Sequence, residues 1–333
     1  MDNNRRLTIP LRLEDVVALA FFLINLAMQI AFSELRGQNL SPADVLIIVP
    51  AVAVLLGKEL VHYFITSRGQ HLESGGDLVN FARPYWEIVR DWTPFLIILL
   101  MYYSLWGDAT HLLVTHDRDA ALVAWDQRLF GFQASVAIQR LISPSLTVWM
   151  QFAYAFHLFN IPIVACFIYL RRPRARFREM MCGLLVVSFL GLVGYVAVPA
   201  IGPMYTLHSQ YTVGLSTPVE AFNREMQFMD FARIRRDVFP SLHVGISFVV
   251  WLYAWRNSKR LAWILSPLIL SLWVSTIYLR YHYLVDCLAG LLLAPLSFWL
   301  ANFLFRRFGE VRVSLPLPAA WANRIHGRVR LDV

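Results

Sequence analysis

The chain is organised around residues 238–245, which read Val-Phe-Pro-Ser-Leu-His-Val-Gly. A polar, arginine-bearing segment ends at this stretch, and an apolar run begins in it. Pro240 suits the first turn of a helix, because its missing N–H has no intrahelical partner there. Ser241 and His243 would then lie in that first turn, among unpaired backbone N–H groups that favour anions. The stretch therefore predicts a phosphate site where a membrane helix begins.

A second stretch, residues 278–286, reads Tyr-Leu-Arg-Tyr-His-Tyr-Leu-Val-Asp and also lies between two apolar runs. His282 and Asp286 are four positions apart, so on a helix they share a face. A carboxylate there can accept a hydrogen bond from one imidazole nitrogen and leave the other nitrogen free to attack. The two stretches together predict a catalytic triad of His243, His282 and Asp286 that acts on a phosphoester.

The Pro-Ser-x-His and His-x-x-x-Asp elements, in this order and each opening an apolar run, resemble the signature of the type 2 phosphatidic acid phosphatase superfamily. The fuller strings 239–243 and 276–286 resemble its inositol phosphorylceramide synthase branch, as do residues 125–131 and 198–203 more weakly. The resemblance covers the C-terminal two thirds or so of the chain. It implies transfer of a phosphoinositol head group from phosphatidylinositol to ceramide, with a phosphohistidine formed on His282.

Two cations of the superfamily's phosphatases are missing from their usual positions. The phosphatases carry a Lys-x6-Arg-Pro element, but neither Arg-Pro pair of this chain, Arg83-Pro84 or Arg172-Pro173, follows a lysine at that spacing. Where the phosphatases have Ser-Arg before the second histidine, this chain has Ser275-Thr276. The synthase branch also lacks these cations, which favours transfer over hydrolysis.

The composition indicates a multipass membrane protein. The 333 residues are 58% hydrophobic and 16% charged, whereas a soluble domain is about 25% charged. Apolar runs of about 20 residues recur along the chain. The net charge of +8 is explained by cytoplasmic loops and anionic lipid, so no nucleic-acid partner is expected. The three cysteines have no metal-ligand spacing, and no metal or other cofactor is expected.

The fold class predicted is all-α, a transmembrane helical bundle of about eight spans, in which the resemblance implies a superfamily core of about six helices. The expected spans are Val16–Phe32, Val45–Phe64, Pro94–Leu113, Leu146–Leu170, Met180–Ala200, Pro240–Trp255, Leu261–Leu279 and Tyr283–Phe305. Three regions are predicted: N-terminal helices with an interfacial segment (1–115), a catalytic core (116–305) and a polar cytoplasmic tail (306–333). The sequence does not indicate the oligomeric state.

Arginines near the spans predict the orientation, because cytoplasmic loops carry an excess of basic residues. The basic loops 171–178 and 256–260 are assigned to the inside, which places both histidine motifs outside, in the periplasm or a lumen. If the source is bacterial, the membrane is the inner one. Arg235 and Arg236 then lie outside, just before His243, and are predicted to bind phosphate.

Three further residues complete the predicted site. Arg280, beside His282, is a candidate for holding phosphoryl oxygens, and an ordinary interfacial anchor is the alternative. Tyr154 and His157 lie within an apolar run, where they could line a head-group cleft or be satisfied core residues. The expected partners are a phospholipid donor, a lipid alcohol acceptor and the bilayer.

Three functional readings remain open at this point. The preferred one is a lipid phosphotransferase. The second is a lipid phosphate or polyprenyl diphosphate phosphatase, and the third is a non-catalytic lipid-binding membrane protein that has kept the motifs.

Overall fold

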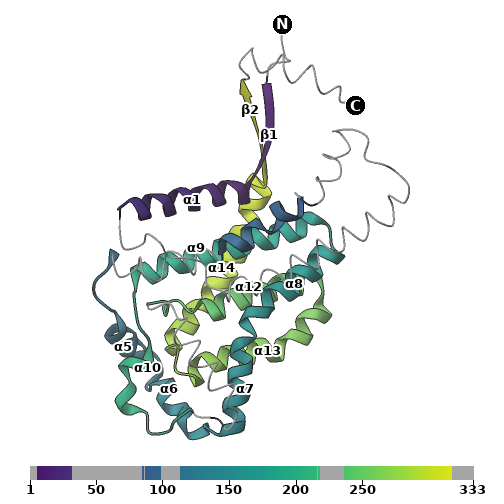
Figure 1. The fold of residues 1–333 in the computed structure, drawn as a ribbon. Helices are drawn as coiled ribbons and strands as arrows, with labels where there is room; N and C mark the ends of the chain where they lie inside the picture. Colours follow the sequence, from purple (N-terminus) through teal and green to yellow (C-terminus); the bar gives the residue numbers. More distant parts are fainter. Residues whose placement is uncertain are drawn as a thin grey trace.

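A computed structural model describes residues 6–31, 85, 87–98, 113–215, 217 and 236–316 of the chain (Figure 1). The expected span Val45–Phe64, most of Pro94–Leu113, and Arg235 lie outside the described residues. The principal helices are α1 (Leu13–Ala31), α5 (Asp119–Phe130), α7 (Pro144–Ala155), α8 (His157–Arg171), α9 (Arg174–Ala197), α12 (Leu242–Asn257), α13 (Lys259–Tyr278) and α14 (Leu284–Phe308). Short helical turns α6 (Ala134–Ala137), η3 (Ile138–Leu141), α10 (Pro203–Thr206) and η4 (His208–Gln210) connect them.

Membrane-spanning helices are present in the described part of the chain. Three helices, α9, α13 and α14, are long and apolar enough to cross a bilayer. The helices α7 and α8 meet the same criteria only as a pair, bent by 46° where they join at Phe156. The protein is therefore an integral membrane protein, and the expectation of about eight spans is confirmed only in part. Helix α12 has 16 residues, about 24 Å, which is shorter than a typical hydrocarbon core of about 30 Å.

Helix α12 occupies the centre of the bundle, where it packs against α8, α9, α13 and α14 (Figure 1). Its contact with α14 depends on Gly290, because a Cβ atom built there would lie 2.4 Å from the Ser241 carbonyl oxygen. Small residues allow this close approach between membrane helices. The contact matters for the site, since each of these two helices begins beside one of the catalytic motifs.

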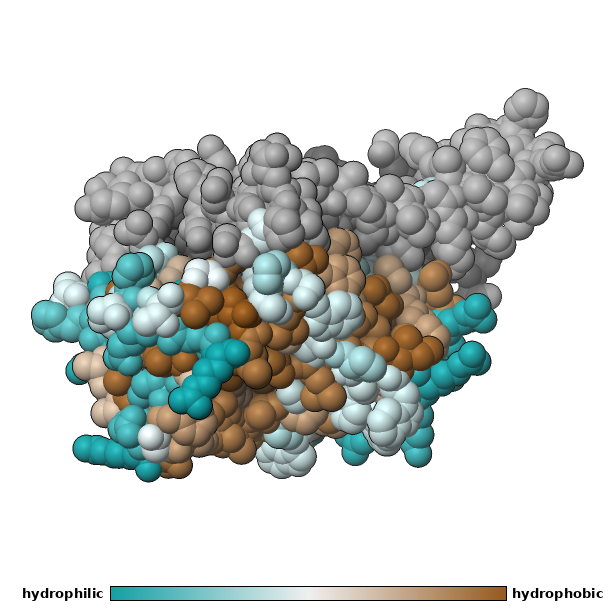
Figure 2. Space-filling view, turned by 90° about the horizontal axis from the view of Figure 1, so that it is seen from below, coloured by the Kyte–Doolittle hydropathy of each residue, from teal (hydrophilic) through white to brown (hydrophobic). Residues whose placement is uncertain are grey.

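Large apolar side chains also cover much of the outer surface. Figure 2 shows apolar residues spread across the described part of one face, with hydrophilic residues mainly towards its margins. The exposed apolar residues include Trp263 on α13, and Leu292 and Trp299 on α14. In water such a surface would be unfavourable, so it is consistent with contact between these helices and lipid chains.

The predicted all-α class is confirmed for the bundle, and the two ends of the described chain add a small antiparallel sheet to it (Figure 1). Strand β1 (Arg6–Arg12) pairs with β2 (Glu310–Pro316), so that Arg6 lies opposite Pro316 and Arg12 opposite Glu310. The sequence analysis assigned these segments to a polar lead and a polar tail. Each is short and partly charged, and its partner strand lies about 300 residues away, so neither gives a local strand signal.

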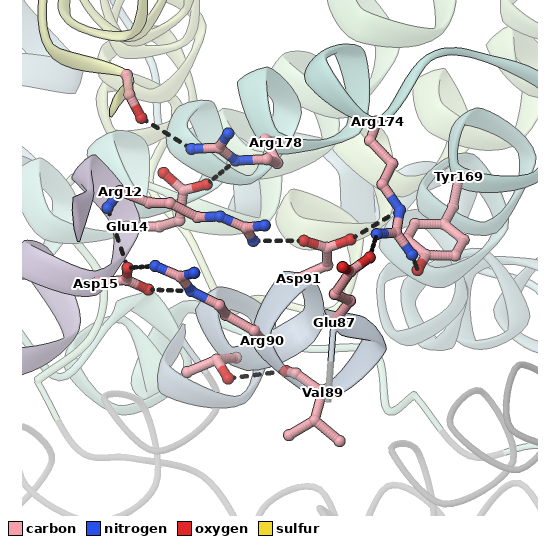
Figure 3. Close-up of polar contacts among 12 residues, drawn as sticks. Arg12, Glu14, Asp15, Glu87, Val89, Arg90, Asp91, Tyr169, Arg174 and Arg178 are labelled. Atoms are coloured by element: carbon pink, nitrogen blue, oxygen red, sulfur yellow. Dashed lines mark hydrogen bonds and ion pairs between the residues drawn. The ribbon is translucent and has the colours of Figure 1, made fainter. Parts of the chain in front are cut away.

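An ion-pair cluster attaches the N-terminal segments to the start of α9 (Figure 3). Arg178 of α9 binds Glu14 of α1, while Arg174 binds Glu87 and lies 3.4 Å from Asp91. The buried Asp91 carboxylate also accepts from Arg12 at 2.6 Å. The expected basic loop 171–178 is therefore partly the first turn of α9, and several of its charges are paired.

Candidate active site

The first motif lies at the start of α12. The helix begins at Leu242 with Ser241 as its N-cap, and Pro240, which a cis peptide bond joins to Phe239, precedes the N-cap. The prediction that Pro240 occupies the first helical turn is therefore wrong, although His243 does lie in that turn. The Ser241 backbone N–H donates to the Asp286 carbonyl at 3.0 Å, so it is already used in joining the two motifs.

The second motif joins the end of α13 to the start of α14. The backbone N–H groups of Tyr281 and His282 both donate to the Thr276 carbonyl, which turns the chain sharply after α13. At the start of α14 the Asp286 carboxylate accepts from the Tyr283 N–H at 2.8 Å. His282 Nδ1 lies 3.6 Å from the same Asp286 oxygen, and both side chains are buried. The expected pairing of His282 with Asp286 is thus present in the structure.

The two predicted catalytic histidines are in direct contact. Nδ1 of His243 lies 3.3 Å from Nε2 of His282, and Nε2 of His243 lies 3.0 Å from the Tyr154 hydroxyl. One assignment of hydrogens satisfies both hydrogen bonds of His243, whereas the 3.6 Å between His282 Nδ1 and Asp286 is beyond hydrogen-bond distance. The Tyr154 hydroxyl donates to His243, His243 Nδ1–H donates to His282 Nε2, and His282 Nδ1–H faces Asp286. The result is a continuous polar chain from α7 to α14.

Tyr154 and His157, which the sequence analysis left as either cleft-lining or core residues, are adjacent to His243. The His157 and His243 ring centroids are 4.7 Å apart, and Tyr154 lies 4.8 Å from both His243 and Tyr281. His157 Nδ1 bonds the Tyr154 carbonyl at 2.7 Å, just where the chain bends between α7 and α8. This bend is what turns Tyr154 and His157 towards the histidine pair.

The predicted phosphate-binding arginines are held by loops. Arg280, at φ 66°, donates to the Val213 carbonyl, and its guanidinium lies 3.9 Å from the centre of the Tyr211 ring. Burial lowers the pKa of Arg280 from its usual value, and the nearby Tyr211 opposes that effect. Arg236 pairs with Asp117 at 2.7 Å and donates to the Val114 carbonyl, so it anchors the segment before α5. Phosphate binding by Arg280, Arg235 and Arg236 stays a prediction.

Two buried carboxylates, Asp119 and Asp126, support the site from α5 and were given no role by the sequence analysis. Asp126 accepts from the backbone N–H groups of Leu284 at 3.0 Å and Val285 at 2.8 Å, at the start of α14. Asp119 accepts from the Gly202 N–H and the Tyr283 hydroxyl. Burial raises the pKa of Asp126, while the two N–H donors act to lower it.

The sequence contains a pattern that could have indicated that these two carboxylates are buried and hydrogen-bonded. Asp119 and Asp126 are seven residues apart, which places them on one face of a helix at its apolar side. Acidic residues at such positions are costly to bury unless they receive hydrogen bonds. Their partners, the backbone groups of residues 201, 202, 284 and 285, are distant in the sequence and could not be named from it.

The described residues contain no cluster of three or more His, Cys, Asp or Glu side chains that could hold a metal ion. The described side chains that meet at this site are three neighbouring imidazoles, those of His157, His243 and His282, together with a buried carboxylate and a phenol. An imidazole oriented by a carboxylate is suited to nucleophilic attack, and a second imidazole beside it is suited to proton transfer.

Comparison with known proteins identifies the family of the chain. The family model of the PAP2 superfamily matches residues 120–300, and the chain belongs to this superfamily. The chain is 27% identical over 180 residues to a phosphoinositol dihydroceramide synthase of Bacteroides thetaiotaomicron, covering 49% of this chain and 57% of that protein. It is also 27% identical over 191 residues to an inositol phosphorylceramide synthase of Candida albicans, covering 52% of this chain and 40% of that protein.

These two relatives place the chain in the inositol phosphorylceramide synthase-like branch of the superfamily, as its motifs predict. The match spans about half of this chain and less than two thirds of either relative. No solved structure matches the chain.

Proposed function

We propose that the protein is a lipid phosphotransferase that moves a phosphoinositol-like head group from a glycerophospholipid to a ceramide-like lipid alcohol. The observation that carries the proposal is the polar chain from Tyr154 through His243 and His282 to Asp286. The similarity to two sphingolipid head-group synthases supports the choice of substrates.

In the first step Nε2 of His282 attacks the phosphorus of the donor diester. An N–P bond forms, and the bond from phosphorus to the diacylglycerol oxygen breaks. Asp286 stabilises the positive charge that develops on the His282 ring, through Nδ1. His243, as imidazolium, gives its proton to the leaving alkoxide, which departs as diacylglycerol.

In the second step the acceptor hydroxyl attacks the phosphohistidine. The now neutral His243 takes the hydroxyl proton, the N–P bond breaks, and His282 is regenerated. Tyr154 suits both charge states of His243, because a hydroxyl can donate to the neutral ring and accept from the imidazolium. The direct contact between His243 and His282 has to open so that the phosphoryl group can lie between or beside the two rings.

The small number of cations near the histidines supports a phosphodiester as the donor. A phosphomonoester carries a charge near −2 and benefits from several fixed cations, whereas a phosphodiester carries one negative charge. Arg236 is committed to Asp117, and Arg280 lies against Tyr211 and Val213. Of these two arginines, Arg280 thus keeps a positive charge that no described carboxylate neutralises, and a single cation suits a diester better than a monoester.

The test uses purified protein in mixed micelles with labelled phosphatidylinositol, with and without ceramide, and with phosphatidic acid as a monoester control. We expect a ceramide-dependent labelled product and diacylglycerol as co-product, separated by thin-layer chromatography. Rapid release of inorganic phosphate from phosphatidic acid, with no acceptor-dependent product, would establish the phosphatase alternative. No turnover of either lipid, with no phosphohistidine on His282, would support the third alternative, a non-catalytic lipid-binding membrane protein.

A further inference from the structure

A groove lies between α12 and α14 at the end of the bundle away from the catalytic histidines. Its volume is about 770 Å³. The lining residues are Leu252, Trp255, Arg256, Phe298, Trp299, Asn302, Phe303, Arg306 and Arg307. The apolar part of the wall is dominated by aromatic rings, among which Trp299 and Phe303 stack at 6.0 Å and are 64% and 53% exposed.

The charged residues that line the groove are all positive, since its lining has three arginines and no acidic residue. Arg256 is already neutralised, because it pairs with Glu179 at 3.0 Å and donates to Asn302 at 2.8 Å. Arg306 and Arg307 are exposed and have no ion pair with the described acidic residues. The groove thus presents, at one end of an aromatic, lipid-accessible wall, two cations that no described carboxylate neutralises.

The position of the groove along the helices separates it from the active site. Asp286 and Arg306 are twenty residues apart on α14, which corresponds to about 30 Å of helix. This is about the thickness of the hydrocarbon core of a bilayer. The arginines therefore lie at the opposite membrane surface from the histidine pair, at the depth where lipid phosphates are found.

We propose that this groove binds one anionic phospholipid of the membrane leaflet opposite to the active site. The phosphate of the lipid lies against Arg306 and Arg307, and an acyl chain lies along Trp299 and Phe303. Basic pockets between membrane helices recognise anionic head groups by this combination of charge and apolar wall. The bound lipid fills the space between the ends of α12 and α14 and holds them together.

The experiment reconstitutes the full chain in nanodiscs of phosphatidylcholine with increasing amounts of phosphatidylglycerol that carries brominated acyl chains. Bromine quenches tryptophan fluorescence at close range, so a specific site gives saturable quenching at low mole fraction. Because the chain has 11 tryptophans, Trp299→Phe identifies the part of the signal that comes from the groove. This variant should remove most of the saturable component.

The variant Arg306→Gln/Arg307→Gln should need roughly tenfold more phosphatidylglycerol for half-saturation. The matched control, Arg171→Gln/Arg260→Gln, removes two exposed charges at the same end of the bundle but outside the groove, and should behave as the wild type. The single variants R306Q and R307Q serve if the double variant does not fold. The proposal is overturned if both double variants shift equally, or if brominated phosphatidylcholine gives the same saturable quenching.

Discussion

At the scale of single residues, the site depends on which nitrogen of each histidine faces which partner. His282 turns Nδ1 towards Asp286 and Nε2 towards His243, so Nε2 is the nitrogen to which the proposed mechanism assigns the attack on phosphorus. His243 turns Nδ1 towards His282 and Nε2 towards the Tyr154 hydroxyl. A histidine with a partner on each nitrogen has a fixed ring orientation, which is what in-line attack requires.

We expect His282→Ala and His243→Ala each to lower kcat by about 10³-fold or more, because one removes the nucleophile and the other the proton donor. The double variant should be little worse than either single variant, since residues that act as a unit do not have additive effects. The measurement is the rate of the transfer assay, with the oligomeric profile in detergent as the folding control. Wild-type turnover by the His282 variant would contradict the mechanism.

Tyr154→Phe removes the hydroxyl that contacts His243 and keeps the ring that packs against Tyr281. We expect kcat to fall about 10- to 100-fold with little change in KM, because His243 loses its fixed orientation and the proton transfer slows. Tyr278→Phe is the matched control. Its buried hydroxyl contacts Thr147 rather than a histidine, so its loss should affect stability more than kcat. Equal kcat losses in both variants would remove Tyr154 from the mechanism.

The sequence predicted the partners that lie within one motif and missed those that lie between motifs. His282 and Asp286 were expected to share a helix face, but α14 begins at Leu284, so the turn before the helix, not helical spacing, brings His282 to Asp286. The approach of His243 followed from the family order of the motifs. The roles of Asp119 and Asp126 did not follow, because their hydrogen-bond partners are backbone groups more than 80 residues away. Arg236 was predicted to bind phosphate from its position in the chain, and the structure pairs it with Asp117.

At the scale of the elements, two helices must approach closely for the motifs to meet. The Ser241 N–H reaches the Asp286 carbonyl only because Gly290 lets α12 lie against α14. We expect Gly290→Ala to destabilise the protein by about 1–3 kcal/mol and to lower kcat, because its Cβ collides with backbone that cannot rotate away. Thermal unfolding and the transfer rate are the measurements.

The matched control for this substitution is Gly214→Ala, since a Cβ built there meets nothing within 4 Å and the residue lies in an exposed loop. It should leave both the unfolding temperature and the rate unchanged. If Gly290→Ala also leaves the unfolding temperature and the rate unchanged, the close approach of α12 and α14 is not required for activity.

Helix α5 also supports the site, because its Asp126 holds the first turn of α14. Both carboxylate oxygens of Asp126 accept from the first turn of α14, so Asp126→Ala should cost about 1–2 kcal/mol, as the loss of an N-cap does. The rate should fall as well, because the same turn carries Asp286. Arg128→Gln, an exposed change two residues along α5, is the control. A fall in stability with an unchanged kcat would make Asp126 a structural cap only.

Helix boundaries were predicted best where the apolar runs are long and uninterrupted. Met180–Ala200, Leu261–Leu279 and Tyr283–Phe305 each correspond to one helix, although each helix begins or ends a few residues away from the prediction. Leu146–Leu170 was predicted as one span and is broken at Phe156. The hydrophobic pattern continues through the bend, and the nearest helix-breaking residue, Pro162, lies six residues past the break, inside α8. The β1–β2 pair was missed because pairing between distant segments leaves no local pattern.

At the scale of the whole molecule, polar chemistry gathers at the two ends of an apolar bundle. The histidine pair, Asp286, Asp119 and Asp126 lie at one end. At the other end, ion pairs join Glu14 to Arg178 and Asp91 to Arg174 at the start of α9. Arg172 donates to the Asn257 carbonyl, which ties the ends of α8 and α12 together. The basic segments 171–178 and 256–260 therefore lie on the same side, as a shared cytoplasmic location requires.

The last prediction concerns the orientation of the protein in the membrane. It tests whether the active site faces away from the cytoplasm. Ala175 in the first turn of α9 and Ser209 in the loop beyond its far end are both exposed. Helix α9 has 24 residues, about 36 Å, so the two positions lie at opposite surfaces of the membrane. In intact cells or sealed vesicles, a cysteine at Ser209→Cys should react with a membrane-impermeant thiol reagent added from outside, and one at Ala175→Cys should not.

The unsubstituted protein, with Cys166, Cys182 and Cys287, gives the baseline for this labelling, and a membrane-permeant reagent shows that Ala175→Cys is reactive in itself. The reverse pattern would place the histidines in the cytoplasm, where a different pool of lipid head groups would meet them. Equal labelling of both positions would mean that α9 does not cross the bilayer. The expected pattern requires instead that the donor lipid and the acceptor reach the histidine pair from the outer leaflet, while the arginines of the α12–α14 groove meet lipid of the inner one.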